Sequence, residues 1–236
     1  MRLFFAALLA ASGLHAAELI VAAASDLAPL AAQLEKGFEK STGEKARFTF
    51  ASSGSLTRQI ENGAPYDVFL SANDKYVNDL ASAGKIDKAS VVVYAQGRIA
   101  LWSPNSALRV PEDLGRADVK HLAIPNPEHA PYGVAARQAL EKSGLWKTVE
   151  PKIVYGENVR QALQFAESGN ADAVITSWTL LIGKGTLLPK ELHAPIRQAA
   201  GIVQASAQKE AAAKFLKFLT SPEGRAILQA GGLFPP

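Results

Sequence analysis

Short apolar runs alternate along this chain with stretches whose apolar positions recur at helical spacing. Residues 18–24 (ELIVAAA) predict a buried strand, and from Asp26 to Gly43 apolar side chains recur three to four positions apart, which predicts a helix. Residues 46–51 (ARFTFA) predict a second strand, and the serine-rich turn at 52–55 leads into another helical run. This repeated strand–turn–helix order is typical of an α/β protein with mostly parallel sheets flanked by helices.

The same order continues to the end of the chain in two clusters of α/β units, which suggests two lobes. The remaining predicted strands are 67–71, 99–103, 122–125, 152–155 and 171–176, and the remaining predicted helices are 75–83, 133–143, 158–168, 208–219 and 222–228.

The first residues of the chain have a different character. Met1 and Arg2 supply a positive charge, residues 3–11 are nine consecutive apolar residues, and small residues follow at Ala16 and Ala17. This pattern predicts a secretory signal peptide over residues 1–17, cleaved after Ala16 or Ala17. Nine apolar residues are too few to cross a bilayer, which needs about 20. We therefore expect an exported protein that works in the periplasm of a two-membrane bacterium.

Composition narrows the function classes. The 236 residues are 48% hydrophobic and 20% charged, which is ordinary for a globular protein and excludes collagen-like and wholly disordered chains. The 25 basic and 22 acidic residues are interspersed, whereas a nucleic-acid-binding protein concentrates positive charge on one face. The chain has no Cys, so disulfides, thiolate metal sites and a lipid anchor on Cys are excluded.

Four predicted strand-to-helix junctions are candidates for chemistry. They are Ser25-Asp26, the turn 53–55, Tyr132-Gly133 and Asn158-Val159. A helix N-terminus offers unpaired N–H groups and a partial positive charge, which together suit an anion, and ligands of open α/β sheets bind at the carboxyl ends of strands. The glycines of two junctions would let an anion approach the backbone. The simpler interpretation is that the Ser and Asn residues only cap their helices.

Other chemistries have weaker signals. A secreted serine hydrolase using Ser25 or Ser53 is an open alternative, although the chain has no G-x-S-x-G motif. His129 lacks the clustered partners of a metal site, which favours a role in its loop. The chain also lacks the G-x-x-x-x-G-K-[ST] motif of an ATPase.

Several of these segments also carry a family resemblance, which spans nearly all of the chain after residue 17. The chain resembles the periplasmic molybdate-binding proteins of ABC transporters, a branch of the type II substrate-binding fold. The matching segments are AAASDL at 22–27, FASSGSLTRQIENGAPYDVFLSAN at 50–73, NPEHAPYG at 126–133 and ENVRQAL at 157–163.

The resemblance implies a two-lobed binding protein with a hinge of two crossings, near 97–100 and 197–201. Lobe boundaries at 18–98 plus 199–236, and at 99–198, follow from it. Such a protein captures molybdate, and we expect tungstate too, and delivers it to a membrane permease and its ATPase. It implies a monomer that is not an enzyme and needs no cofactor, with molybdenum entering only as the oxyanion and no side chain ligating the metal.

The resemblance also implies site residues. Ser25 and Ser53 correspond to donors from one lobe, and Tyr132 and Val159 to backbone N–H donors from the other. Many members place a Tyr hydroxyl at a strand end where this chain has Thr176 and Ser177, so those residues, or the Tyr132 phenol, are candidates to replace it.

Asp26 is ambiguous because a carboxylate repels a bound dianion. We expect it to turn away and cap its helix. Alternatively, it accepts a proton from a ligand such as hydrogen phosphate. For this reason phosphate, like sulfate, remains an alternative ligand.

Overall fold

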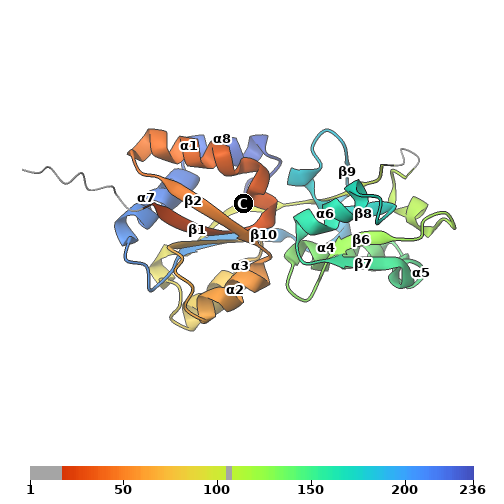
Figure 1. Cartoon of the computed structure of the whole chain (residues 1–236), viewed down its shortest axis with the longest axis horizontal. Coiled ribbons are helices and arrows are strands. Elements are labelled where there is room, and N and C mark those ends of the chain that lie inside the picture. Colours follow the sequence, from red (N-terminus) through yellow and green to blue (C-terminus); the bar gives the residue numbers. More distant parts are fainter. Residues whose placement is uncertain (1–17, 105–107) are drawn as a thin grey trace, which may run out of the picture.

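The computed structural model describes residues 18–104 and 108–236. The predicted signal peptide, residues 1–17, lies outside these residues. The described chain forms two five-stranded sheets, each covered by helices on both faces, and the two assemblies lie side by side (Figure 1). We call the first sheet with its helices lobe 1, and the second sheet with its helices lobe 2.

In the sheet of lobe 1, four strands run in one direction and β10 runs against them. The strand order is β2 (Ala46–Ala51), β1 (Leu19–Ala24), β3 (Val68–Ser71), β10 (Ile196–Ile202) and β4 (Val92–Gly97).

Both faces of this sheet are buried by helices, which explains why its strands are almost continuously apolar. One core lies under η1 (Ser25–Leu30), α1 (Ala31–Thr42), α7 (Lys209–Leu219) and α8 (Pro222–Ala230). There the rings of Phe38 and Phe215 meet edge to face with centroids 5.2 Å apart. The opposite core lies under α2 (Ser53–Glu61) and α3 (Asp74–Ser82).

Lobe 2 repeats the arrangement with one reversed strand, β5. Its strand order is β7 (Ile153–Gly156), β6 (Leu122–Pro125), β8 (Ala173–Ser177), β5 (Ile99–Trp102) and β9 (Thr186–Leu187). The helices α4 (Pro131–Lys142) and α5 (Trp146–Val149) cover one face and α6 (Val159–Glu167) covers the other. Short 3₁₀ turns complete the chain: η2 (Lys88–Ser90), η3 (Pro111–Gly115), η4 (Glu150–Lys152), η5 (Trp178–Leu180) and η6 (Lys190–Leu192).

The chain passes between the two sheets twice. β4 ends at Gly97 in the first sheet and β5 begins at Ile99 in the second, so the first passage is at Arg98, as predicted. The return lies before Ile196, which already pairs with Gly97 in the first sheet. This is a few residues earlier than the second crossing predicted at 197–201. The lobe boundaries given above stay a prediction.

The α/β class is confirmed, but both sheets are mixed rather than mostly parallel, since each has two parallel and two antiparallel strand pairs. The strands β4, β9 and β10 are also absent from the predicted set. β4 was not predicted, because it directly precedes the strand that opens lobe 2 and no helix separates the two. The helix predicted from Asp26 starts instead as the 3₁₀ turn η1, which contains Pro29, and continues as α1.

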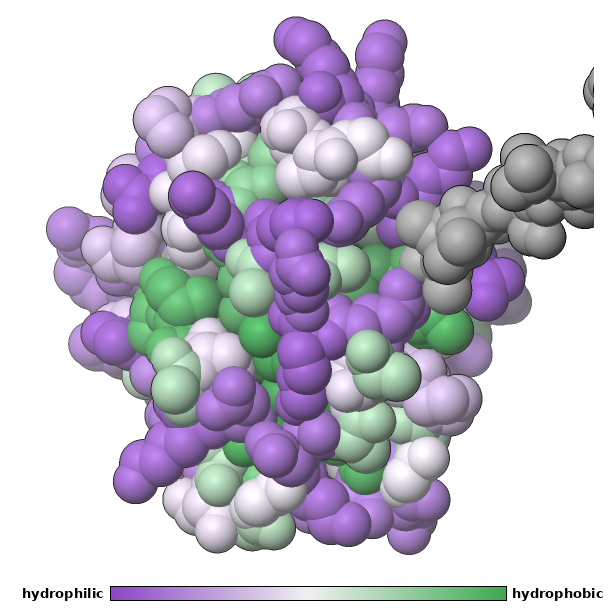
Figure 2. Space-filling model, turned by 90° about the vertical axis from the view of Figure 1, so that its left-hand side faces the viewer, coloured by the Kyte–Doolittle hydropathy of each residue, from purple (hydrophilic) through white to green (hydrophobic). Residues whose placement is uncertain are grey.

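Seen from the end of lobe 1, the surface is mostly hydrophilic, with smaller hydrophobic areas between polar side chains (Figure 2). Within residues 18–104 and 108–236, no helix is both long and apolar enough to cross a membrane.

Candidate functional site

The carboxyl ends of β1, β2, β6 and β7 face one another where the two lobes meet. Each of these strands leads into a helix start, and these starts surround one narrow cavity with room for about one water molecule. Its lining contains all four predicted donors and Asp26, together with small and capping residues from the same turns: Ala24, Ser25, Asp26, Ser52, Ser53, Ala72, Ala130, Pro131, Tyr132, Asn158 and Val159. Convergence of the four junctions, which periodicity alone did not establish, is thus a property of the fold.

Lobe 1 presents two serines to the cavity. Ser53 is the first residue of α2, and its Oγ accepts a hydrogen bond from the N–H of Ala72 at 3.0 Å, which leaves its own hydroxyl proton to be donated. Ser52 caps α2 by accepting from the N–H of Ser55. The N–H of Ser53 therefore lies in a first helical turn, where backbone donors have no partner within the helix.

Lobe 2 contributes the starts of two helices. Val159 is the first residue of α6, and the side chain of Asn158 accepts from the N–H groups of Arg160 and Gln161, but not from that of Val159. Tyr132 is the second residue of α4, after Pro131. The helix starts thus turn N–H groups of Tyr132 and Val159 toward a cavity that both residues line.

The glycines at two of these junctions have a different role from the predicted one. A Cβ on Gly54 would lie 2.8 Å from Cβ of His129, and a Cβ on Gly133 would lie 2.0 Å from the carbonyl oxygen of Pro125. Protein atoms, rather than an anion, occupy the space beside them. Gly54 permits the two lobes to touch, and its N–H donates to the carbonyl of His129 at 2.9 Å.

The expectation that Asp26 caps its helix is wrong. η1 begins without a side-chain cap, and the carboxylate points across the cleft instead. Its Oδ2 accepts from the hydroxyl of Tyr132 at 2.8 Å and from Nε2 of Gln198 at 2.5 Å. Burial raises the pKa of Asp26 from its usual 3.8 to about 6, against the opposing effect of these hydrogen bonds.

Asp26 belongs to a buried polar network that the sequence did not reveal. Gln198 also donates to the hydroxyl of Tyr132 at 2.9 Å, and it accepts from the hydroxyl of Tyr94 at 2.7 Å. Gln198 is fully buried in a strand that is otherwise largely apolar. A polar amide at such a position was the available signal, because buried polar groups need partners.

Thr176 and Ser177 lie at the end of β8 and are absent from the cavity lining given above. The Thr176 hydroxyl donates to the carbonyl of Val159 at 2.9 Å, and the Ser177 hydroxyl bonds with that of Thr179 at 2.8 Å. The Thr179 hydroxyl in turn lies 2.7 Å from the backbone carbonyl of Asp26. Both predicted hydroxyls therefore form hydrogen bonds with protein groups. That of Thr176 positions the start of α6, and that of Ser177 positions the Thr179 hydroxyl, which makes the contact between the lobes.

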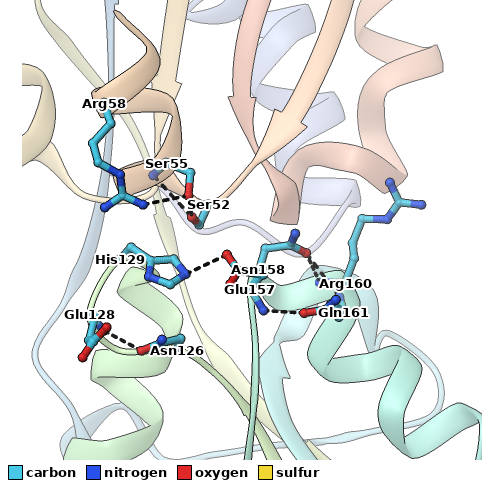
Figure 3. A network of polar contacts seen from close by, with 10 residues as sticks. All are labelled: Ser52, Ser55, Arg58, Asn126, Glu128, His129, Glu157, Asn158, Arg160 and Gln161. Carbon is cyan, nitrogen blue, oxygen red and sulfur yellow. Dashed lines mark hydrogen bonds and ion pairs between the residues drawn. The ribbon is translucent and has the colours of Figure 1, made fainter. Parts of the chain in front are cut away.

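At the rim of the cleft, polar side chains form separate groups in each lobe (Figure 3). In lobe 1, Arg58 donates to the Ser55 hydroxyl. In lobe 2, Nε2 of His129 lies 3.2 Å from a carboxylate oxygen of Glu157. Among the residues drawn, no dashed contact joins the two lobes, so the rims can separate without breaking these groups.

The site shows little support for the alternative chemistries. In the described part of the chain, no hydrogen bond is formed between Ser25 or Ser53 and a histidine, and the hydroxyl oxygen of Ser53 accepts from the N–H of Ala72 instead. The same residues contain no group of three or more His, Asp or Glu side chains that could hold a metal ion.

Comparison with known proteins agrees with this geometry. The family described as "Bacterial extracellular solute-binding protein" matches residues 19–234. A molybdate-binding protein ModA of Rhodobacter capsulatus is 36% identical over 224 residues, which cover 92% of this chain and 88% of that protein. A ModA of Azotobacter vinelandii is also 36% identical, over 95% of this chain and 92% of that protein.

The solved structure of the Azotobacter vinelandii periplasmic molybdate-binding protein superimposes with a TM-score of 0.88. The match covers 93% of this chain and all of that chain, at 33% sequence identity. Similarity therefore extends over both lobes and the passages between them.

Proposed function

Because this chain belongs to the bacterial extracellular solute-binding proteins, we propose that it captures molybdate between its two lobes and delivers it to an ABC transporter. The observation that carries the proposal is the convergence of Ser25, Ser53, Tyr132 and Val159 on one cavity. These residues offer neutral hydroxyl and N–H donors, which suit a fully deprotonated tetrahedral anion. Relatives of similar length are named molybdate-binding proteins.

Binding involves no covalent chemistry in this proposal. The anion is held by hydrogen bonds from two helix starts in lobe 2 and two serines in lobe 1, and closing the lobes excludes water and strengthens each bond. No cofactor takes part, and the metal of molybdate stays inside its shell of oxygens. Tungstate, a dianion of the same shape, binds in the same way.

The proposed ligand also indicates where the protein works and which proteins it meets. The protein is exported by the predicted signal peptide at 1–17, works as a monomer in the periplasm, and meets the membrane permease and ATPase of its transporter. The lobe built on the first sheet, which includes all of β10, and the lobe built on the second sheet close on the ligand.

Isothermal titration calorimetry of the protein from residue 18 onward tests the proposal. Molybdate, tungstate, sulfate and phosphate are titrated separately at pH 7. We expect tight 1:1 binding of molybdate and tungstate, and weaker binding of sulfate and phosphate. Preferential binding of sulfate or phosphate would replace molybdate as the ligand, and absence of binding to all four would contradict the proposed function.

A further inference from the structure

The carboxyl group of Asp26 has one satisfied and one unsatisfied oxygen. Oδ2 accepts the two hydrogen bonds from Tyr132 and Gln198, whereas Oδ1 is buried and has no partner among the described residues. The side chain is 1% exposed, so water does not replace the missing partner. A buried carboxylate with an unpaired oxygen is costly, and neutralisation by a proton is the usual remedy.

The groups that face Asp26 do not neutralise it. They are the hydroxyl of Tyr132 from α4, the amide of Gln198 from β10 and, behind it, the hydroxyl of Tyr94 from β4. The hydroxyl of Thr179 from η5 donates to the backbone carbonyl of Asp26 and not to its carboxyl group. The charged residues of α1, β2, α4, α6 and β10 are all exposed, except for half-buried Glu35. Throughout residues 18–104 and 108–236, no ion pair to Asp26 is formed.

The same carboxyl group lines the cavity that we assign to the oxyanion. A divalent anion beside an ionised carboxylate would meet strong repulsion, because few mobile dipoles screen two like charges in a closed, buried space. With the proton on Oδ1, the repulsion between Asp26 and the anion is removed. Oδ1, which otherwise has no partner, can then donate a hydrogen bond to the anion. The hydrogen bonds at Oδ2 leave Oδ1 as the oxygen for the proton.

We propose that Asp26 determines affinity by holding a proton on Oδ1 whenever the site contains a fully deprotonated divalent oxyanion, so that binding takes up one proton from solvent. The inference rests on the proposed function. The proton comes from water or buffer and stays on the carboxyl group, and no bond in the anion breaks. The raised pKa of Asp26, about 6, makes this protonation accessible near neutral pH.

The proton on Asp26 distinguishes anions by the protons that they carry. A fully deprotonated dianion needs donors on every side, and a protonated Asp26 adds one. Hydrogen phosphate brings its own proton, which ionised Asp26 can accept at Oδ1, so its binding takes up no proton from solvent. The ligand-free protein with ionised Asp26 therefore pairs proton uptake with the capture of anions that carry no proton.

Calorimetry in two buffers of different ionisation enthalpy measures the protons taken up per molybdate bound. At pH 7.5 we expect about one proton in the wild-type protein, with affinity that falls by up to tenfold per pH unit between pH 7 and 8.5. Asp26→Asn should take up no proton and bind with an affinity independent of pH. Asp118→Asn, at an exposed carboxylate paired with Arg116, is the matched control and should retain the wild-type proton uptake.

The outcomes separate this inference from the proposed function. Tight binding of molybdate to the wild type with no proton uptake at pH 7.5 overturns the role of Asp26 and leaves the function intact. Proton uptake that persists in Asp26→Asn assigns the proton to another group and also overturns the inference. If Asp26→Asn does not fold, the wild-type measurement alone still decides.

Discussion

The hydroxyl of Tyr132 in lobe 2 donates a 2.8 Å hydrogen bond to Oδ2 of Asp26 in lobe 1. The two residues are 106 positions apart, and both side chains are almost fully buried. A hydrogen bond to a carboxylate in such surroundings is worth about 1.5–3 kcal/mol. Because the bond joins the two lobes, it stabilises the closed arrangement in which the cavity exists.

Removing this bond should weaken ligand binding. In Tyr132→Phe the ring and the backbone N–H remain, but the contact between the lobes is lost and Gln198 loses one acceptor. We expect molybdate affinity to fall about tenfold or more, because closure becomes less favourable. Calorimetry measures the affinity, and small-angle scattering of the loaded protein measures closure.

Tyr94→Phe is the matched control for this change. It deletes the same kind of buried hydroxyl, whose hydrogen bond to Gln198 lies within lobe 1. It should lower the free energy of unfolding by about 1 kcal/mol while leaving affinity within about threefold. Equal affinity in Tyr132→Phe and the wild type would show that the bond between lobes does not stabilise the bound state.

The raised pKa of Asp26 predicts how stability depends on pH. Burial raises this pKa from 3.8 to about 6, so the folded protein holds the proton more tightly than the unfolded chain. The resulting stabilisation is fully present below about pH 4 and is lost as the pH rises through about 6. It amounts to about 3 kcal/mol.

Asp26→Asn lacks this titration. Denaturant unfolding without ligand should therefore show the variant gaining about 3 kcal/mol relative to the wild type between pH 4 and pH 7. A constant difference between the two proteins across this range would mean that Asp26 has an ordinary pKa in the folded protein.

The four junctions of the site could be predicted because their signals are local. Ser53 and Val159 each follow a strand and open a helix, behind the caps Ser52 and Asn158, and such caps are readable from a few neighbouring residues. That the four junctions line one cavity depends on strand order and on how the lobes meet. Only the family resemblance supplied that information.

The polar network around Asp26 could not be predicted either, because it also depends on contacts between residues that are far apart in the sequence. Gln198 lies 172 residues from Asp26 and 104 from Tyr94, and it reaches them because β10 returns to the first sheet between β3 and β4. Local pattern rules favour capping for an Asp at a helix start, and here tertiary contacts outweighed that preference.

The hydroxyl of Ser53 is expected to contribute directly to anion binding. Its Oγ already accepts from Ala72, which fixes its position at the cavity wall and leaves its proton for the ligand. Ser53→Ala should weaken molybdate binding by about 1.5–3 kcal/mol, which is roughly tenfold to a hundredfold or slightly more. Ser41→Ala, which removes a hydroxyl at the end of α1, should leave the affinity unchanged. Unchanged affinity in Ser53→Ala would remove this residue from the proposed site.

Gly54 offers a test of lobe closure that leaves each lobe intact. A Cβ at this position would lie 2.8 Å from Cβ and 3.0 Å from the backbone of His129 in the opposite lobe. Within α2 itself, alanine is a better helix former than glycine, so Gly54→Ala should not reduce the stability of lobe 1. The steric conflict arises only when the lobes meet, and the cross-lobe hydrogen bond from the Gly54 N–H to the His129 carbonyl lengthens or breaks.

We therefore expect Gly54→Ala to bind molybdate at least tenfold more weakly, with an unfolding midpoint that equals or exceeds the wild-type value in the absence of ligand. Gly115→Ala is the control, since a Cβ there would meet only Leu145 Cδ2, at an ordinary contact distance of 3.9 Å. Small-angle scattering with saturating molybdate should give a larger radius of gyration for Gly54→Ala than for the control. If the two variants bind equally well and close to the same radius, contact between α2 and the His129 loop is not part of the bound state, and the closed arrangement described here does not represent it.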